Sequence, residues 1–197
     1  MRQSPAKPPV IATPDQATQP DRPVPKILLL SDTHGALHPR ILALAATVDG
    51  VVHAGDIGDP AILDLLASVA NGLIAVRGNN DVAGRWPGAR HADLAALGER
   101  AELQLPGGCL VVEHGHRVNP AAHRHAGLRA RHGGARAVVY GHTHRQTVDT
   151  ACKPWIINPG AAGRSRTFGG SGCALLEATA RRWRVQTFQF PLADWKT

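Results

Sequence analysis

Short, mainly apolar runs alternate along the first half of the chain with longer stretches in which apolar residues recur at helical spacing. The runs at 26–30, 51–54 and 73–76 each lead into polar residues and a glycine, and helical patterns at 39–48 and 60–70 separate them. Strands that are apolar along their whole length are typical of parallel sheets covered on both faces, and their alternation with helices favours strand–helix–strand units. This half therefore predicts a parallel sheet with helices packed on it.

The second half is richer in strand patterns. Residues 100–113 form a predicted hairpin around Pro106-Gly107-Gly108, which are turn residues, and a helical stretch follows at 119–133. Further strands are predicted at 135–140, around 155–157, at 171–179 and at 181–190. Together the two halves predict an α/β fold, a four-layer α/β/β/α sandwich of two mixed β-sheets flanked by helices.

The first 25 residues differ from the rest of the chain. They contain seven of the fifteen prolines and show almost no apolar periodicity. Because proline cannot continue a sheet ladder or a helix interior, residues 1–25 are predicted to be a disordered tail, and residues 26–197 the folded domain. This segment has no continuous apolar core of the kind found in signal peptides, so a cytoplasmic location is expected.

Composition narrows the function classes. Lys and Arg number 22 against 15 Asp and Glu, which gives a net charge of +7, and aromatic residues make up only 4%. The basic excess suits anionic substrates, whereas the scarcity of aromatic side chains makes nucleic acid an unlikely partner. The sequence has no long uncharged apolar run, so no membrane-spanning segment is expected. The three cysteines form no C-x-x-C pair, so neither a disulfide framework nor a cysteine zinc site is expected.

Histidine, aspartate and asparagine collect where five predicted strands end. In open α/β sheets ligands bind beyond the carboxyl ends of the strands, so these side chains are expected to converge. Imidazole, carboxylate and amide oxygen together suit Mn, Fe, Co, Ni or Zn better than Ca or Mg. Each motif alone is weak, but five coincidences in one chain of this length are implausible. The motifs are Asp32-Thr33-His34, Gly55-Asp56, Gly78-Asn79-Asn80-Asp81, His114-Gly115-His116 and Gly141-His142-Thr143-His144.

Other histidines and arginines have plainer interpretations. His53 lies within a strand pattern and is interpreted as a core residue. The histidines of the helical stretch 119–133, which are His123, His125 and His132, are interpreted as part of a solvated basic face. Arg164 and Arg166 follow the Asn158-Pro159-Gly160 turn, and for them both a phosphate contact and a surface position stay open.

The order of the five motifs closely resembles the calcineurin-like metallophosphoesterase superfamily over residues 26–190. The VRGNND form and Asn158-Pro159-Gly160 resemble its small prokaryotic YfcE-type phosphodiesterase branch. The resemblance implies two divalent transition-metal ions, with Mn expected and Fe, Ni, Co or Zn as alternatives. It assigns Asp32, His34, Asp56 and His144 to the first ion, and Asp56, Asn79, His114 and His142 to the second. Asp56 would bridge them, and a shared hydroxide would attack a small phosphodiester.

One departure from the family pattern affects the expected substrate. Phosphatase members of the superfamily read G-N-H-[DE], whereas this chain has Asn80 at the histidine position. An amide can hydrogen-bond a phosphate oxygen but cannot serve as a general acid near neutral pH, so activated diesters are the expected substrates. Asn80, Asp81 and His116 are the candidate catalytic residues, and Asn80, Arg164 and Arg166 the candidate substrate-binding residues.

Two other function classes stay open. One is a non-catalytic scaffold module, since a retromer subunit keeps this fold without relying on catalysis. The other is a phosphomonoesterase or a nuclease. A homo-oligomer is also left open.

Overall fold

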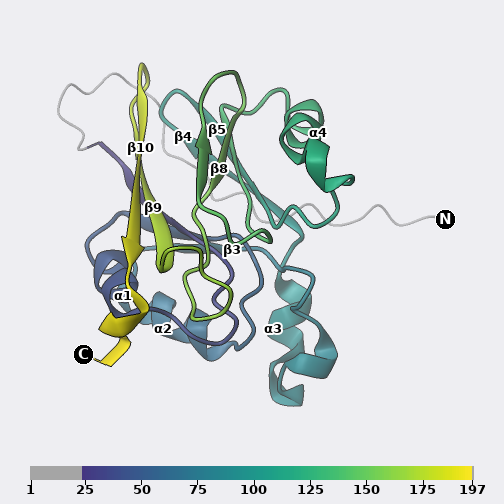
Figure 1. Ribbon diagram of the computed structural model, residues 1–197, viewed down its shortest axis with the longest axis vertical. Helices are drawn as coiled ribbons and strands as arrows, with labels where there is room; N and C mark the ends of the chain where they lie inside the picture. Colours follow the sequence, from purple (N-terminus) through teal and green to yellow (C-terminus); the bar gives the residue numbers. More distant parts are fainter. Residues whose placement is uncertain (1–23, 197) are drawn as a thin grey trace.

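A computed structural model describes residues 24–196 (Figure 1). Apart from its last two residues, the predicted tail lies outside this range. Two five-stranded sheets pack face to face, with helices on their outer faces, and the predicted four-layer α/β sandwich is confirmed. The first sheet contains β1 (Lys26–Leu30), β2 (Gly50–His53), β3 (Leu73–Ala75), β9 (Ser171–Ala178) and β10 (Trp183–Phe190). The second contains β4 (Arg100–Leu105), β5 (Gly108–Glu113), β6 (Ala137–Val139), β7 (Thr147–Asp149) and β8 (Trp155–Asn158).

Both sheets combine parallel and antiparallel neighbours. The strand order of the first is β10-β9-β1-β2-β3, in which β1, β2 and β3 are parallel and β9 and β10 form an antiparallel hairpin. The order of the second is β4-β5-β6-β8-β7, in which β5, β6 and β8 are parallel. The carboxyl ends of neighbouring parallel strands meet at one edge of each sheet, which is where the polar motifs follow.

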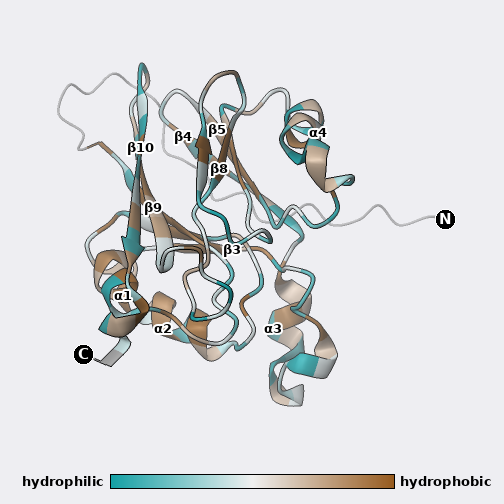
Figure 2. Ribbon diagram, viewed as in Figure 1, coloured by the Kyte–Doolittle hydropathy of each residue, from teal (hydrophilic) through white to brown (hydrophobic). Residues whose placement is uncertain are grey.

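The alternation of side chains along β1 explains why its residues 27–30 are all apolar. Ile27 and Leu29 of β1 face the other sheet in the central core, whereas Leu28 and Leu30 face the helices outside. Both faces of the strand are therefore buried, so no polar position is tolerated along it. On the far side of the second sheet, Leu128 packs against the outer face of β5, β6 and β8. In Figure 2, β5 and β8 are brown, in keeping with this burial, whereas the edge strand β10 is paler and has teal segments.

The helices are short, and α1, α2 and α4 lie within the three helical stretches that the sequence predicts. The α-helices are α1 (Pro39–Ala45), α2 (Ala61–Val69), α3 (His91–Ala96) and α4 (Arg124–Arg131), and the 3₁₀ helices are η1 (Ala83–Arg85), η2 (Gly88–Arg90), η3 (Ala121–His123) and η4 (Leu192–Lys196). Helix α3 and strand β7 are not apparent in the sequence. Leu94 is the buried residue of α3, and β7 is an edge strand with no buried position, so neither carries a clear apolar period.

Candidate metal centre

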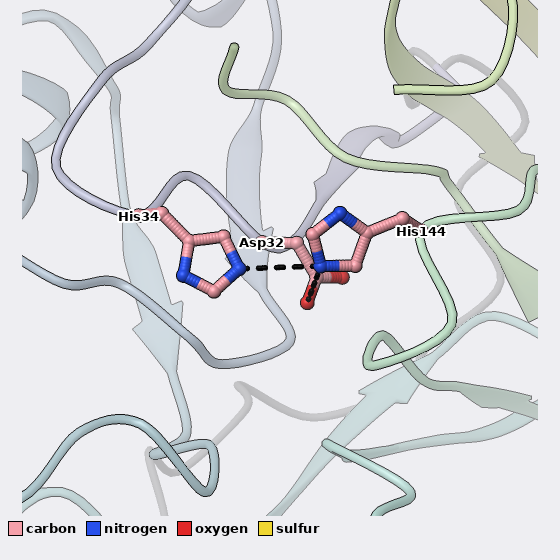
Figure 3. Close-up of side chains that lie close together, drawn as sticks. All are labelled: Asp32, His34 and His144. Carbon is pink, nitrogen blue, oxygen red and sulfur yellow. Dashed lines mark hydrogen bonds and ion pairs between the residues drawn. The ribbon is translucent and has the colours of Figure 1, made fainter. Parts of the chain in front are cut away.

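The loops that follow β1, β2, β5 and β6 bring their acidic and histidine side chains to one place between the two sheets. Asp32 and His34 come from the first loop, Asp56 from the second, His114 from the third and His144 from the fourth. Their ligand atoms form two groups, each with all atoms within 4.8 Å of one another: Asp32, His34 and His144, and Asp32, Asp56 and His114. Figure 3 shows the His34 and His144 rings meeting edge to edge above the Asp32 carboxylate.

Spacing between the ligand atoms fits a shared cation. His34 Nε2 lies 3.2 Å from His144 Nε2, which lies 3.3 Å from an Asp32 oxygen. His114 Nε2 and His34 Nε2 lie 3.4 and 3.7 Å from Asp56 Oδ2. Donors bound about 2.0–2.2 Å from one ion are about 2.8–3.6 Å apart. Three of the four distances fall within this range, as neighbouring ligands around a metal would, and the His34–Asp56 distance lies just above it.

The remaining predicted ligands lie at the edge of this group. His142 Nδ1 is 3.0 Å from Asn79 Oδ1, and the His142 backbone N–H donates to both oxygens of Asp32. Burial, with the positive charges of His114 and Arg124, lowers the pKa of His142 to about 4. Its ring is therefore neutral at physiological pH, which is the form that binds a metal.

Hydrogen bonds on the far side of two rings determine which nitrogen faces the centre. His114 Nδ1 lies 2.8 Å from the Ala54 carbonyl and His144 Nδ1 lies 2.9 Å from the Ser165 carbonyl. Because a carbonyl only accepts, each Nδ1 carries the proton and Nε2 faces the centre. His114 Nε2 is buried without a hydrogen-bond partner, which fits a nitrogen that serves as a metal ligand.

Strained backbone is concentrated at these residues. Asp32, His34, Asp56, His142 and His144 have φ between 47° and 68°, a left-handed conformation that side-chain-bearing residues rarely adopt. Across residues 24–196, the remaining non-glycine residue with positive φ is Arg166, which also reaches the centre. Such conformations cost of order 1–3 kcal/mol each and cluster at functional sites. The loops are bent here so that the side chains point inward.

Two glycines allow the carboxylates to pack directly against backbone. A Cβ at Gly141 would lie 2.8 Å from Asp32 Oδ2, and one at Gly78 would overlap Asp56. Side chains at these positions would displace the two carboxylates, which explains the glycine beside each motif.

The two central carboxylates have opposite electrostatic environments. Burial raises the pKa of Asp32 to about 7. Burial has the same tendency at Asp56, but the positive charge of His114, whose Nε2 lies 3.4 Å from Asp56 Oδ2, and the hydrogen bonds from Asn80 outweigh it and hold that pKa well below its usual range. Asn80 donates its backbone N–H (2.8 Å) and its side-chain Nδ2 (2.6 Å) to Asp56. Asp56 is therefore the stable anion of the centre.

Asp81 supports the loops and does not itself face the ligands. Its buried carboxylate accepts backbone N–H groups of Ile57 (3.1 Å), Gly58 (3.0 Å) and Gly78 (2.8 Å). It thereby ties the loop after β2 to the loop after β3, which carry Asp56 and Asn79.

The other predicted site residues differ in position. The His116 ring lies 5.5 Å from that of His114 and 6.3 Å from that of His142, so it borders the centre. Arg166 places Nη2 3.1 Å from His144 Nε2. Arg164, by contrast, stacks its guanidinium 4.2 Å from the Trp195 ring centre, so the structure separates the two arginines.

Some contacts could not be read from sequence. Arg85, from η1, donates to Asn80 Oδ1 at 2.5 Å, and the Ser165 carbonyl that orients His144 comes from a loop 21 residues away. The stretch after Asp81 carries no motif that points to either contact.

The histidines outside the five motifs differ in how well their positions match the expectations from the sequence. His53 is fully buried as expected: Gly55 N–H donates to its Nδ1, so its Nε2 donates to Thr33. The expectation that His132 lies on a solvated face is wrong. It is buried, with Nε2 2.7 Å from Glu113, because the end of α4 turns back onto β5. His125 is half-buried beside the Tyr140 hydroxyl, while His123 is exposed as expected.

Comparison with known families agrees with this geometry. Residues 26–181 match the model of the calcineurin-like phosphoesterase superfamily domain. The chain belongs to this superfamily. A probable metallophosphoesterase of Methanocaldococcus jannaschii is 29% identical over 141 residues, which are 68% of this chain and 66% of that protein. The chain thus spans slightly less than two thirds of that relative.

Solved structures share the fold. An archaeal phosphodiesterase superposes with a TM-score of 0.62 at 19% identity, covering 83% of this chain and 99% of its own. Vps29 of Chaetomium thermophilum superposes with a TM-score of 0.67 at 15% identity, covering 83% and 97%. Within residues 24–196 of this superfamily member, the helices are too short or too polar for any of them to cross a membrane.

Proposed function

We propose that this superfamily member is a dinuclear-metal-dependent phosphodiesterase that hydrolyses small phosphodiesters. The observation that carries the proposal is the convergence of imidazole and carboxylate donors from four loops at metal-ligand spacing, with two rings held in the metal-binding tautomer. Asp32, His34, Asp56 and His144 would hold the first ion, and Asp56, Asn79, His114 and His142 the second. The donor set suits Mn, our expected metal, and also Fe, Co, Ni or Zn.

Bound there, two divalent ions would supply an activated water and neutralise charge on the phosphoryl oxygens. The chain's own residues would then position the ester. Arg85 is a hydrogen-bond donor only, so it fixes Asn80 with its oxygen outward and its Nδ2 toward the centre. Asn80 Nδ2 donates one N–H to Asp56 and would offer its other N–H to a phosphoryl oxygen. Arg166, whose guanidinium reaches His34 and His144, would offer a second donor at the opposite side.

The preference for diesters rests on what Asn80 lacks. Since an amide has no proton to transfer near neutral pH, a good leaving group that departs without protonation is favoured. A phosphodiester with an aryl leaving group meets this condition, whereas an alkyl monoester does not. His116 borders the centre and is the candidate to assist a poorer leaving group.

The test is hydrolysis of bis(p-nitrophenyl) phosphate by the full chain reconstituted with Mn²⁺, compared with p-nitrophenyl phosphate. We expect a higher kcat/KM for the diester, and loss of both bound metal and turnover in Asp56→Asn. Asp64→Asn, on the exposed face of α2, is the matched control that should keep both. A wild-type protein that binds two ions but turns over neither ester would overturn the proposal.

That last outcome would favour a second function, a non-catalytic interaction module. The fold shared with Vps29 supports considering it. The complete donor set favours the enzyme, because an interaction surface alone does not require five loop residues in left-handed backbone conformations. A small phosphodiester as partner, rather than nucleic acid, and a cytoplasmic location remain expectations.

A further inference from the structure

A cleft of about 510 Å³ lies beside the metal centre, between η3 and α4 on one side and the loop after β6 on the other. Its basic lining residues are three arginines, Arg124, Arg129 and Arg145, and two histidines, His123 and His125. The other lining residues are alanine, threonine and tyrosine, so none of the residues that line it is acidic. The cleft is therefore positively charged and open to an anion.

Arg124 is the unusual residue of this cleft. Its side chain is 91% buried, with 9% relative exposure, and Nε donates to the Gly115 carbonyl at 3.2 Å. Among the ion pairs that the described part of the chain forms, none involves Arg124. Buried arginines are normally paired, because an unpaired buried charge is strongly destabilising.

The other arginines of α4 follow the usual pattern. Arg129 pairs with Asp149 at 2.7 Å, and Arg131 pairs with Glu113 at 3.2 Å. Arg124 is more deeply buried than either and lacks such a carboxylate. Its fixed guanidinium thus has donors left over for a group that is not part of the described chain.

Two loops of the metal centre contribute to the cleft or contact a residue that lines it. Thr143 lines the cleft and stands between His142 and His144, which face the metal centre. Gly115, which anchors Arg124, stands between His114 and His116. Arg124 is also close enough to His142 for its charge to lower the pKa of that candidate ligand, so the cleft lies near the metal centre.

Arg145 provides a second cation on the opposite wall. It is exposed, its guanidinium lies 3.9 Å from the Phe168 ring centre, and it too is absent from the ion pairs formed within residues 24–196. Stacking on the ring restricts the guanidinium while leaving its edge N–H groups free for an oxyanion.

We propose that this cleft binds a second phosphate group of the substrate, held by Arg124 and Arg145 while the scissile diester lies at the metal centre. This inference rests on the proposed function and narrows its substrate class to diesters that carry a further phosphate, such as phosphorylated nucleotide esters. Phosphate is the favoured anion because arginine forks match its geometry with paired, charge-assisted hydrogen bonds.

The test compares two probes that differ by one phosphate, thymidine 5′-monophosphate and thymidine 3′,5′-bisphosphate, by calorimetry on the Mn²⁺-loaded full chain. We expect the bisphosphate to bind about 10- to 100-fold more tightly, the range for a hydrogen bond between charged groups. Arg124→Met should abolish this preference. Arg145→Met, at an exposed position that folding does not depend on, should reduce it. Arg184→Met, an exposed charge loss on β10, should preserve it.

Turnover separates the two proposals. The substrates are the p-nitrophenyl ester of thymidine 5′-phosphate and the same ester with a 3′-phosphate. We expect the ester with the 3′-phosphate to be hydrolysed faster, and Arg145→Met to reduce the difference between the two rates. Equal affinity of the wild type for the two nucleotides, or a preference unchanged in both Arg124→Met and Arg145→Met, would refute the anion cleft whatever the activity. If the wild type hydrolyses neither ester but binds the bisphosphate more tightly, and the two variants lose that preference, the phosphodiesterase proposal is refuted and the anion cleft is supported.

Discussion

Replacing Asp81 tests whether the loops of the metal centre are held by one carboxylate. In Asp81→Ala the backbone N–H groups of Ile57, Gly58 and Gly78 lose their acceptor. Leaving a buried donor without a partner costs about 1–3 kcal/mol, and three donors lose their acceptor at once in this variant. We therefore expect Asp81→Ala to lower the free energy of unfolding by about 3–5 kcal/mol.

Asp81→Asn gives a graded version of the same change. The amide oxygen can replace Oδ2, which accepts from Ile57 and Gly78, but the amide nitrogen then faces the Gly58 N–H. One hydrogen bond is lost and not three, so the expected destabilisation is about 1–3 kcal/mol.

The assay is urea unfolding of metal-free protein in the presence of a chelator, since bound metal would add its own stabilisation. Asp64→Ala, which removes an exposed ion pair with Arg90, should leave the midpoint almost unchanged. A positioning role for Asp81 requires the urea midpoint to rise from Asp81→Ala to Asp81→Asn to the wild type. If both Asp81 variants unfold like the wild type and lose only kcat, the carboxylate acts on the substrate and the positioning argument is refuted.

Three further outcomes are expected. Affinity for Mn²⁺ should rise between about pH 6 and 8, because the metal must displace protons from two candidate ligands. Burial raises the pKa of Asp32 to about 7, and at His114 the two neighbouring carboxylates outweigh burial and raise the pKa. Calorimetry in buffers of different ionisation enthalpy would count the protons released. A pH-independent affinity would contradict this. Asn80→His should raise the kcat/KM ratio of monoester to diester by about 100-fold, the lower end of the range for general-acid catalysis. Arg85→Leu should raise KM for the diester more than it lowers kcat, with Arg85→Lys restoring it in part; an unchanged KM would remove Arg85 from substrate positioning.

The layers of the fold could be predicted because burial on both faces leaves a simple signature. Residues 27–30 are apolar without interruption, since alternate side chains enter the central core and the outer helix layer. Helix α3 and strand β7 left no such signature, because their positions are mostly exposed. Their boundaries depend on contacts with distant segments, which a local pattern does not contain.

The candidate ligands could be predicted for a related reason. Each lies in the loop that follows a strand, so the sheet topology alone brings it to the shared edge. The contacts that orient them could not, because they join residues far apart on irregular loops. Arg166 reaches His34 across 132 residues of sequence, while Arg164, two residues earlier, stacks on Trp195. Nothing in the local composition distinguishes these two arginines.

The centre belongs to neither sheet alone. Asp32, His34, Asp56 and Asn79 follow strands of the first sheet, whereas His114, His142 and His144 follow strands of the second. Either set alone lacks donors for two ions, so the distance between the sheets determines whether the centre forms. That distance is set by the central core, where residues such as Leu29 and Val139 pack between the layers. Apolar side chains of this core thereby control the metal centre although they contribute no donor to it.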